Sequence, residues 1–193
     1  FSDDNEIYNI KLLQKGFEKL IKSKLPNIKI FTPCDALELE QIVKYCAFKS
    51  KGPNYIRIGK SGEKNFSHLS KEKWKFNKIR LIDQYKNSKT CIITFGPIIK
   101  IAFEAKQKIK KLDIYSCSTL KPFDDKKNLL KIFKKYKKIV ILEDHSEIGG
   151  LTEIIKGFAY EYNFKGKIIS FSLKDEFIDC YGSQEDLLKK HDI

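Results

Sequence analysis

Residues 139–151 read IVILEDHSEIGGL, and this stretch indicates the fold of the chain around it. Its first four residues are all apolar, which predicts a strand buried on both faces, as in a parallel sheet. After a polar turn, the pair Gly149-Gly150 leads into a predicted helix from Leu151 to about Tyr162. The stretch therefore indicates an α/β protein.

The same alternation continues on both sides of this stretch. Further strands are predicted at residues 91–96, 113–118 and 167–173, with helices at about 98–111 and 125–137. Residues 183–186 (SQED) have the spacing of a capping box and predict a short C-terminal helix. Buried strands alternating with helices predict a three-layer α/β/α domain with a mostly parallel sheet.

The N-terminal part of the chain predicts a smaller unit. It consists of an amphipathic helix and two short strands, expected at residues 12–21, 28–33 and 54–59. Between the strands, Asp35 and Glu38 have capping-box spacing and start a helix that extends to about Phe48. Strand, helix and strand with turns of this length predict a βαβ unit with parallel pairing.

Residues 60–88 separate the two units. They are polar and charged, show no sustained periodicity and contain the isolated Trp74. We interpret them as an inter-domain connection with room for one short strand. The predicted domains are residues 1–75 and residues 76–193.

The composition restricts the classes of function. The net charge is +13, but only Arg57 and Arg80 of the 38 basic residues are arginine, the residue that suits bidentate recognition of bases and phosphates. Because acidic residues are interspersed among the lysines, we expect a solvated lysine surface and no nucleic-acid partner. No apolar run approaches the roughly 18 residues of a membrane span, so no membrane association is expected.

Cysteine and methionine usage adds two expectations. The five cysteines are widely spaced and include no CxxC pair, and Cys91 and Cys117 lie in apolar runs, where cysteine behaves as a small hydrophobe. A reducing cytoplasm therefore fits better than a disulfide framework or a zinc site. The chain begins at Phe1 and contains no methionine, so we expect it to be part of a longer protein.

Several residues are candidates for chemistry. Gly149-Gly150 resembles an anion-binding turn at a helix start, although such a pair more often serves close packing. Glu143, Asp144 and His145 follow a strand and could form a proton shuttle or half a metal site, or serve only a turn or an interface. His68 and His191 lie in polar segments and are expected to be solvated.

Lys60 is the candidate for binding a substrate phosphate. It directly follows the strand predicted at residues 54–59, so its ammonium group would project from the carboxyl edge of a parallel sheet. The competing interpretation is a solvated loop lysine.

Three motifs go further, because in order and spacing they resemble the C-terminal domain of transketolases. They are STLKPFD at residues 118–124, ILEDHSEIGGL at 141–151 and DEFIDCYGSQEDLLKKHDI at 175–193. Upstream, residues 25–60 (LPNIKIFTPCDALELEQIVKYCAFKSKGPNYIRIGK) resemble the last βαβ unit of the pyrimidine-binding domain of the same family.

The resemblance implies the C-terminal part of a thiamine-diphosphate-dependent transketolase that transfers two-carbon ketol units between sugar phosphates. Thiamine diphosphate and Mg²⁺ would belong to the complete enzyme, and this chain alone would contain no catalytic residue and bind no cofactor. The implied partners are an N-terminal transketolase subunit or domain, a second copy in a homodimer, and a sugar phosphate. Lys60 lies where the family usually has a basic residue that holds the substrate phosphate.

Other interpretations remain open. Deoxyxylulose-phosphate synthases often carry an arginine three residues before the Lys-Pro turn, a position that Ser118 occupies here. The beta subunits of ketoacid dehydrogenases also end in this kind of domain. A non-catalytic α/β dimerisation or interaction module that kept the fold is the alternative from another class.

Overall fold

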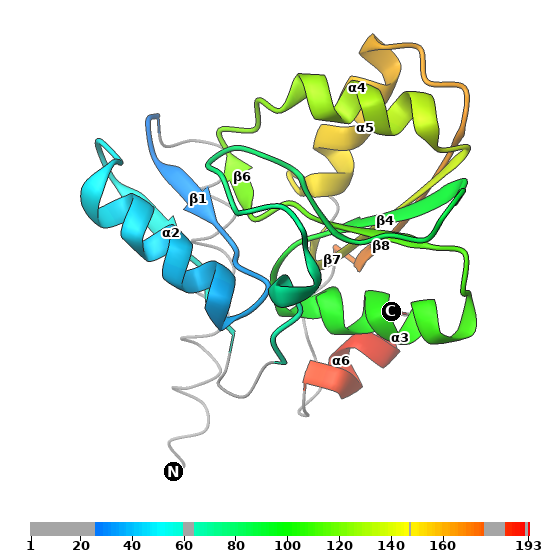
Figure 1. Cartoon of the computed structure of the whole chain (residues 1–193), viewed down its shortest axis with the longest axis horizontal. Helices are drawn as coiled ribbons and strands as arrows, with labels where there is room; N and C mark the ends of the chain where they lie inside the picture. Colours follow the sequence, from blue (N-terminus) through cyan, green and yellow to red (C-terminus); the bar gives the residue numbers. More distant parts are fainter. Residues whose placement is uncertain (1–25, 60–63, 147, 176–183, 192) are drawn as a thin grey trace.

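The computed structural model describes residues 26–59, 64–146, 148–175, 184–191 and 193 (Figure 1). The helix predicted at residues 12–21, the predicted phosphate ligand Lys60 and the predicted cap Ser183 lie outside the described residues.

The predicted βαβ unit is present. Strand β1 (Lys29–Phe31), helix α2 (Ala36–Phe48) and strand β2 (Asn54–Ile56) follow one another, and β1 pairs in parallel with β2. Asp35 is the N-cap of α2 and accepts a hydrogen bond from the Glu38 backbone N–H at 2.9 Å. Glu38 reaches one residue further back than a capping box requires, because its carboxylate accepts the Cys34 N–H at 2.8 Å.

A strand from the C-terminal half completes this small sheet. Strand β6 (Thr119–Lys121) pairs antiparallel with β1, which gives the order β2-β1-β6. Strand β6 was not predicted from the sequence. It makes the N-terminal unit continuous with the larger domain.

The main sheet has five strands in the order β3-β5-β4-β7-β8. The strands are β3 (Arg80–Asp83), β4 (Thr90–Thr94), β5 (Asp113–Ser116), β7 (Lys138–Ser146) and β8 (Lys167–Leu173). All neighbours pair in parallel except the edge strand β3, which runs antiparallel to β5. The predicted mostly parallel sheet is confirmed.

Helices cover both faces of this sheet (Figure 1). One face carries α3 (Ile99–Lys108) and α6 (Gln184–Lys190), and the other carries α4 (Lys126–Lys135) and α5 (Leu151–Glu161). Two short 3-10 turns, η1 (Ser67–Leu69) and η2 (Gly96–Ile98), lie in the connections. A separate apolar core lies under each helical layer, so the three-layer architecture is confirmed.

The connection between the two units is packed against both of them. The Trp74 ring lies 5.7 Å from Tyr45 and 6.5 Å from Phe31, and Phe76 stacks on Tyr45 at 4.6 Å. The Trp74 indole N–H donates to the Ser118 hydroxyl at 2.9 Å. The segment therefore fills the junction between the sheets, and it contains the one short strand expected there, β3.

The expectations for the cysteines and histidines were partly correct. Cys91 and Cys117 are buried in the apolar core, as predicted, and His68 is exposed. His191, expected in solvent, is only 5% exposed, because its Nδ1 accepts the Lys174 N–H at 3.0 Å where the C-terminus folds back on the end of β8. Among the described residues, no helix is both long enough and apolar enough to cross a membrane.

Candidate functional site

Glu143 explains the glycine turn at the start of α5. Its side chain is fully buried, and its two carboxylate oxygens accept the backbone N–H groups of Leu151 and Thr152 at 2.8 and 3.1 Å. A carboxylate at a helix N-terminus satisfies N–H groups that have no partner within the helix and interacts favourably with the helix dipole. The anion at this turn is therefore a side chain of the protein itself.

The two glycines of the turn serve geometry. Gly149 has a φ of +72°, which a glycine adopts without strain. A Cβ atom on Gly150 would lie 2.3 Å from Glu143 Oε2 and 2.7 Å from the Ser146 carbonyl oxygen. Close packing, the commoner role of such a pair, is thus confirmed, and the alternative of a ligand-binding turn is not supported.

Asp144 forms an ion pair that joins the two sheets. Its carboxylate accepts both terminal N–H groups of Arg57 at 2.7 and 3.0 Å, and the Asp144 side chain is only 6% exposed. Arg57 follows β2 and Asp144 lies near the end of β7. The bidentate pair therefore fixes the carboxyl end of β2 to the carboxyl edge of the main sheet.

His145 is also directed to a structural contact. It is 8% exposed, and its Nδ1 lies 2.7 Å from the Ser146 carbonyl oxygen, so that nitrogen donates a hydrogen bond. The three neighbours 143–145 thus serve a helix start, an ion pair and a turn. In the part of the chain that the structure describes, no group of three or more His, Cys, Asp and Glu side chains could hold a metal ion.

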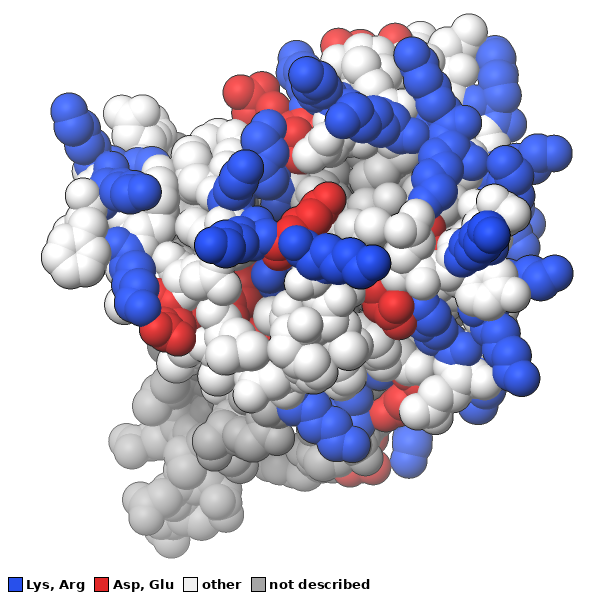
Figure 2. Space-filling model, viewed as in Figure 1, with Lys and Arg blue, Asp and Glu red and all other residues white. Residues whose placement is uncertain are grey.

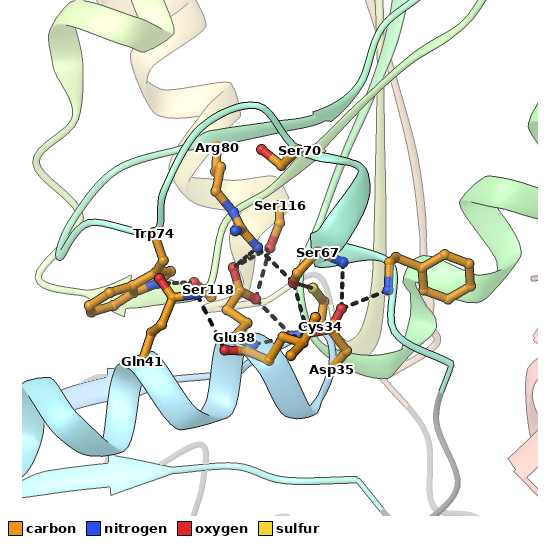
Figure 3. Close-up of polar contacts among 12 residues, drawn as sticks. Cys34, Asp35, Glu38, Gln41, Ser67, Ser70, Trp74, Arg80, Ser116 and Ser118 are labelled. Carbon is orange, nitrogen blue, oxygen red and sulfur yellow. Dashed lines mark hydrogen bonds and ion pairs between the residues drawn. The ribbon is translucent and has the colours of Figure 1, made fainter.

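A second buried polar network lies where α2 meets the main sheet (Figure 3). Arg80 donates to Glu38 Oε1 at 2.9 Å and to the Ser67 hydroxyl at 2.8 Å, and both charged side chains are at most 4% exposed. Ser116 donates to the same carboxylate at 3.3 Å. Glu38 is thereby bound to β3 and β5, in addition to the Cys34 N–H at the start of its own helix.

Asp35 holds η1 against the start of α2. Its carboxylate accepts the N–H groups of Phe66 and Ser67 at 2.7 and 2.6 Å and the Ser67 hydroxyl at 2.7 Å. Burial raises the pKa of Asp35, but its hydrogen bonds to Glu38, Ser67 and Phe66 outweigh burial and leave the pKa below its usual value. Burial raises the pKa of the adjacent Cys34 thiol, and the carboxylates of Glu38 and Asp35 raise it further, so this cysteine is a poor nucleophile.

Both arginines of the chain therefore form ion pairs with buried carboxylates. Arg57 binds Asp144 and Arg80 binds Glu38, each across a junction between segments distant in sequence. Neither role was predicted from the sequence. The rarity of arginine was the available signal, because a planar guanidinium suits buried ion pairs better than an ammonium group does.

This architecture defines the class of protein. It is an α/β protein with a mostly parallel sheet between two helical layers, extended by a βαβ unit that is bound to the carboxyl edge of that sheet. Residues 80–193 match the family model of the transketolase C-terminal domain. The chain belongs to this family.

Known proteins agree with this assignment. The chain is 26% identical over 177 residues to a 1-deoxy-D-xylulose-5-phosphate synthase of Alkaliphilus oremlandii, a match that covers 87% of the chain and 27% of the relative. It is 29% identical over 135 residues to a putative transketolase family protein of Sinorhizobium fredii, which covers 68% of the chain and 38% of the relative. The chain thus spans between about a quarter and two fifths of these relatives.

A solved structure gives the same result. It is a split-gene transketolase in the form of an inactive β4 tetramer, and it superimposes with a TM-score of 0.74 at 25% sequence identity. The match covers 90% of this chain and 55% of the solved chain. The likeness therefore extends beyond the C-terminal domain into the βαβ unit.

The start of α5 does not fit the diphosphate of thiamine diphosphate, the cofactor that the family implies. The N-terminus of α5, where helix N–H groups could bind a diphosphate, is filled by the Glu143 carboxylate. No step of a thiamine-dependent reaction is assigned to the described residues.

Proposed function

We propose that this chain is the C-terminal part of a transketolase that transfers two-carbon ketol units between sugar phosphates. The observation that carries the proposal is the match to a split-gene transketolase over 90% of the chain. It includes the βαβ unit, which we assign to the end of a pyrimidine-binding domain at residues 1–75, followed by the C-terminal domain at residues 76–193.

The remainder of the enzyme supplies the cofactor site in this proposal. An N-terminal subunit or domain binds thiamine diphosphate and Mg²⁺, and two copies of the assembly form a dimer in the cytoplasm. The Glu143 carboxylate, which occupies the N-terminus of α5, supports this division. The chemistry is that of the cofactor, and the protein orients the substrate and places charge near it.

Lys60 is the proposed ligand of the substrate phosphate. It follows Arg57 by three residues, and the bidentate contact of Arg57 with Asp144 fixes the carboxyl end of β2. Ligands of α/β proteins bind at this end of parallel strands. Both arginines are already paired with carboxylates, so neither is available to bind the phosphate. Lys60 would bind it as a point charge, without the two parallel hydrogen bonds that an arginine can donate.

A deoxyxylulose-phosphate synthase is the second candidate, and its support is the similarity to the enzyme of Alkaliphilus oremlandii. Against it stands Ser118, which occupies the position of that family's frequent arginine. The Ser118 side chain is 1% exposed and accepts the Trp74 indole N–H, so an arginine would not fit without displacing Trp74.

Co-expression with a candidate N-terminal subunit tests the proposal. The assembled pair should bind thiamine diphosphate and Mg²⁺ saturably and should transfer ketol units between sugar phosphates. Formation of 1-deoxy-D-xylulose 5-phosphate instead would favour the second candidate. An assembled pair that binds no cofactor would make the chain a non-catalytic interaction module.

Exchange of Lys60 tests the phosphate ligand. Lys60→Ala in the assembled enzyme should raise KM for a phosphorylated substrate by about tenfold or more, because a charge-assisted hydrogen bond is lost. Lys64→Ala, at an exposed lysine four residues further on, is the matched control and should leave KM unchanged. Equal kinetics for both variants would assign Lys60 to a solvated loop.

A further inference from the structure

The two edges of the main sheet differ in what their outer backbone groups contact. At the β3 edge the backbone of Leu81 is bound on its outer side: its carbonyl oxygen accepts the Ser70 hydroxyl at 2.6 Å, and its N–H donates to the Glu72 carboxylate at 3.3 Å. A loop that occupies the backbone groups of an edge strand keeps that strand from pairing with another one. The β3 edge is therefore closed.

Strand β8 forms the opposite edge of the sheet, and its outer side is open. The Lys167 N–H donates inward to the Lys137 carbonyl oxygen at 2.9 Å, and successive residues of a strand direct their backbone groups to alternate sides. The N–H and C=O groups of Ile168, Ser170 and Ser172 therefore point outward, away from β7. Among the described residues, none of these outward groups has a hydrogen-bond partner.

The side chains of β8 resemble those of a strand with neighbours on both sides. Residues 168–173 read IISFSL, without charge or proline, in a chain in which 33% of the residues are charged and lysines cover much of the surface (Figure 2). The central strand β4 (TCIIT) has the same character, but it pairs with β5 on one side and β7 on the other. Edge strands of natural proteins usually carry charges or proline that prevent pairing. Strand β8 thus has an interior composition at an open edge.

A second copy of the same strand fits this edge. Two β8 strands related by a two-fold axis through Ser170 run antiparallel, and Ile168 of each copy then lies opposite Ser172 of the other. All three outward residues of each copy thereby face outward residues, and such opposite residues exchange both of their N–H···O=C bonds. Any other two-fold register leaves one of the three outside the paired strands. The extra residues of the register shift lie in β7, so β8 itself is regular along its length.

The side chains agree with this register. Phe171 and Ile169 lie on the same face of the sheet, and the two-fold axis places Phe171 of each copy directly opposite Ile169 of the other. Aromatic and β-branched side chains stabilise antiparallel strands when they lie opposite each other. Phe171 is 41% exposed in the single chain and would be covered by this contact. Lys167, the one charged residue of the strand, lies opposite the apolar Leu173, so no like charges meet.

We infer that β8 pairs with β8 of a second copy of this chain, which joins two five-stranded sheets into one continuous sheet. A two-fold contact requires only one surface, provided that this surface is complementary to itself. One strand from each copy makes a small interface, so the dimer should have a dissociation constant of about 10 to 100 µM. The pairing needs neither a cofactor nor an N-terminal subunit, and it does not rest on the proposed transketolase function.

Charge at the two-fold axis tests the pairing, because residue 170 lies opposite its own counterpart. Ser170→Lys and Ser170→Glu each bring like charges together and should raise the dissociation constant of the dimer at least about tenfold. A one-to-one mixture of the two variants should restore the association, since lysine then faces glutamate. Gln107→Lys, at an exposed position on α3, adds the same charge as Ser170→Lys and should leave the association unchanged. Sedimentation velocity of the full chain between about 5 and 200 µM measures each case.

Amide hydrogen exchange of the unmodified chain locates the contact without any substitution. The outward N–H groups of Ile168, Ser170 and Ser172 should exchange more slowly at about 200 µM than at about 5 µM, because pairing protects them. The Leu81 N–H at the closed β3 edge is the control and should show no such change.

A chain that stays monomeric up to about 200 µM would overturn the inference. A dimer that Ser170→Lys leaves intact would do the same, because the two copies would then meet at another surface. Equal losses in Ser170→Lys and Gln107→Lys would point to a general effect of charge and would also contradict the pairing. If Ser170→Lys leaves self-association unchanged but prevents co-purification with a candidate N-terminal subunit, the β8 edge binds that subunit instead of a second copy.

Discussion

At the scale of single residues, Glu143 and Gly150 require each other. The Glu143 carboxylate can cap α5 only because Gly150 has no Cβ, since that atom would lie 2.3 Å from Oε2. The carboxylate in turn satisfies two N–H groups that would otherwise be buried without partners. The family motif at residues 141–151 therefore ends the buried strand β7 and starts the buried helix α5, with the Glu143 carboxylate as the acceptor for the first N–H groups of the helix.

Gly150→Ala and Gly157→Ala form a matched pair within the same helix region. Gly150→Ala should destabilise the fold by about 2 kcal/mol or more, because the new methyl group overlaps Glu143 and the Ser146 carbonyl oxygen. Gly157 lies within α5 with open space where its Cβ would be, so Gly157→Ala should stabilise by about 0.5 to 1 kcal/mol. Urea unfolding measures both, and a stable Gly150→Ala variant would contradict the packing argument.

The carboxylate itself can be tested separately. Glu143→Ala leaves two buried helix N–H groups without an acceptor and should cost about 1 to 3 kcal/mol. Glu143→Gln keeps one acceptor oxygen and should cost less. Glu104→Ala, at an exposed position on α3, is the control and should stay within about 0.5 kcal/mol in the same unfolding measurement.

At the scale of elements, the start of α2 is held by a carboxylate that must stay ionised. Asp35 caps the helix and binds η1 at once, and its hydrogen bonds lower its pKa from the model-peptide value of 3.8. The folded state therefore binds this proton less readily than the unfolded state does. The stability that Asp35 contributes is complete above about pH 5 and is lost as the pH falls through the unfolded and then the folded pKa.

Asp35→Asn should reveal this dependence. At neutral pH the variant should be less stable than the unmodified chain by about 1 to 3 kcal/mol, because an amide nitrogen replaces one acceptor oxygen. The difference should shrink as the pH is lowered from about 5 towards 3, since the aspartate becomes protonated. Urea unfolding at several pH values gives the comparison, and a difference independent of pH would show that the charge is not what stabilises α2.

Prediction from the sequence succeeded for elements whose signal is local. The apolar run of β7 and the helical periodicity of α4 can both be recognised from neighbouring residues alone. Strand β6 was not predicted, because the chain leaves β5 at Ser116 and enters the other sheet at Thr119 with only two residues between the strands. A change of sheet has no local pattern, since pairing partners are chosen by the rest of the fold.

In the candidate site, too, local features could be predicted from the sequence and long-range contacts could not. The glycine turn and its close packing could be predicted from the residues, and so could the cap at Asp35. The ion pairs of Arg57 and Arg80 could not be predicted, because their partners lie 87 and 42 residues away in sequence. Only the folded structure shows that Asp144, predicted as part of a proton shuttle or a metal site, forms an ion pair with Arg57 that joins the two sheets.

At the scale of the whole molecule, the two sheets should unfold together. They share the β1–β6 pairing, the Arg57–Asp144 pair, the Arg80–Glu38 pair and the aromatic cluster around Trp74. Trp74 is the only tryptophan of the chain, so its fluorescence reports on this junction alone. Circular dichroism in the far ultraviolet reports mainly on the helices, most of which cover the main sheet.

Arg80→Met tests how strongly the junction is held. It leaves the fully buried Glu38 without its cation and should cost about 3 to 5 kcal/mol. Lys44→Met breaks an exposed pair with Glu40 and should cost less than about 1 kcal/mol.

In the unmodified chain the fluorescence and dichroism transitions in urea should coincide, as cooperative unfolding requires. A fluorescence transition at lower urea than the dichroism transition would mean that the βαβ unit separates first, and the unit would then be a separable domain rather than part of one cooperative fold.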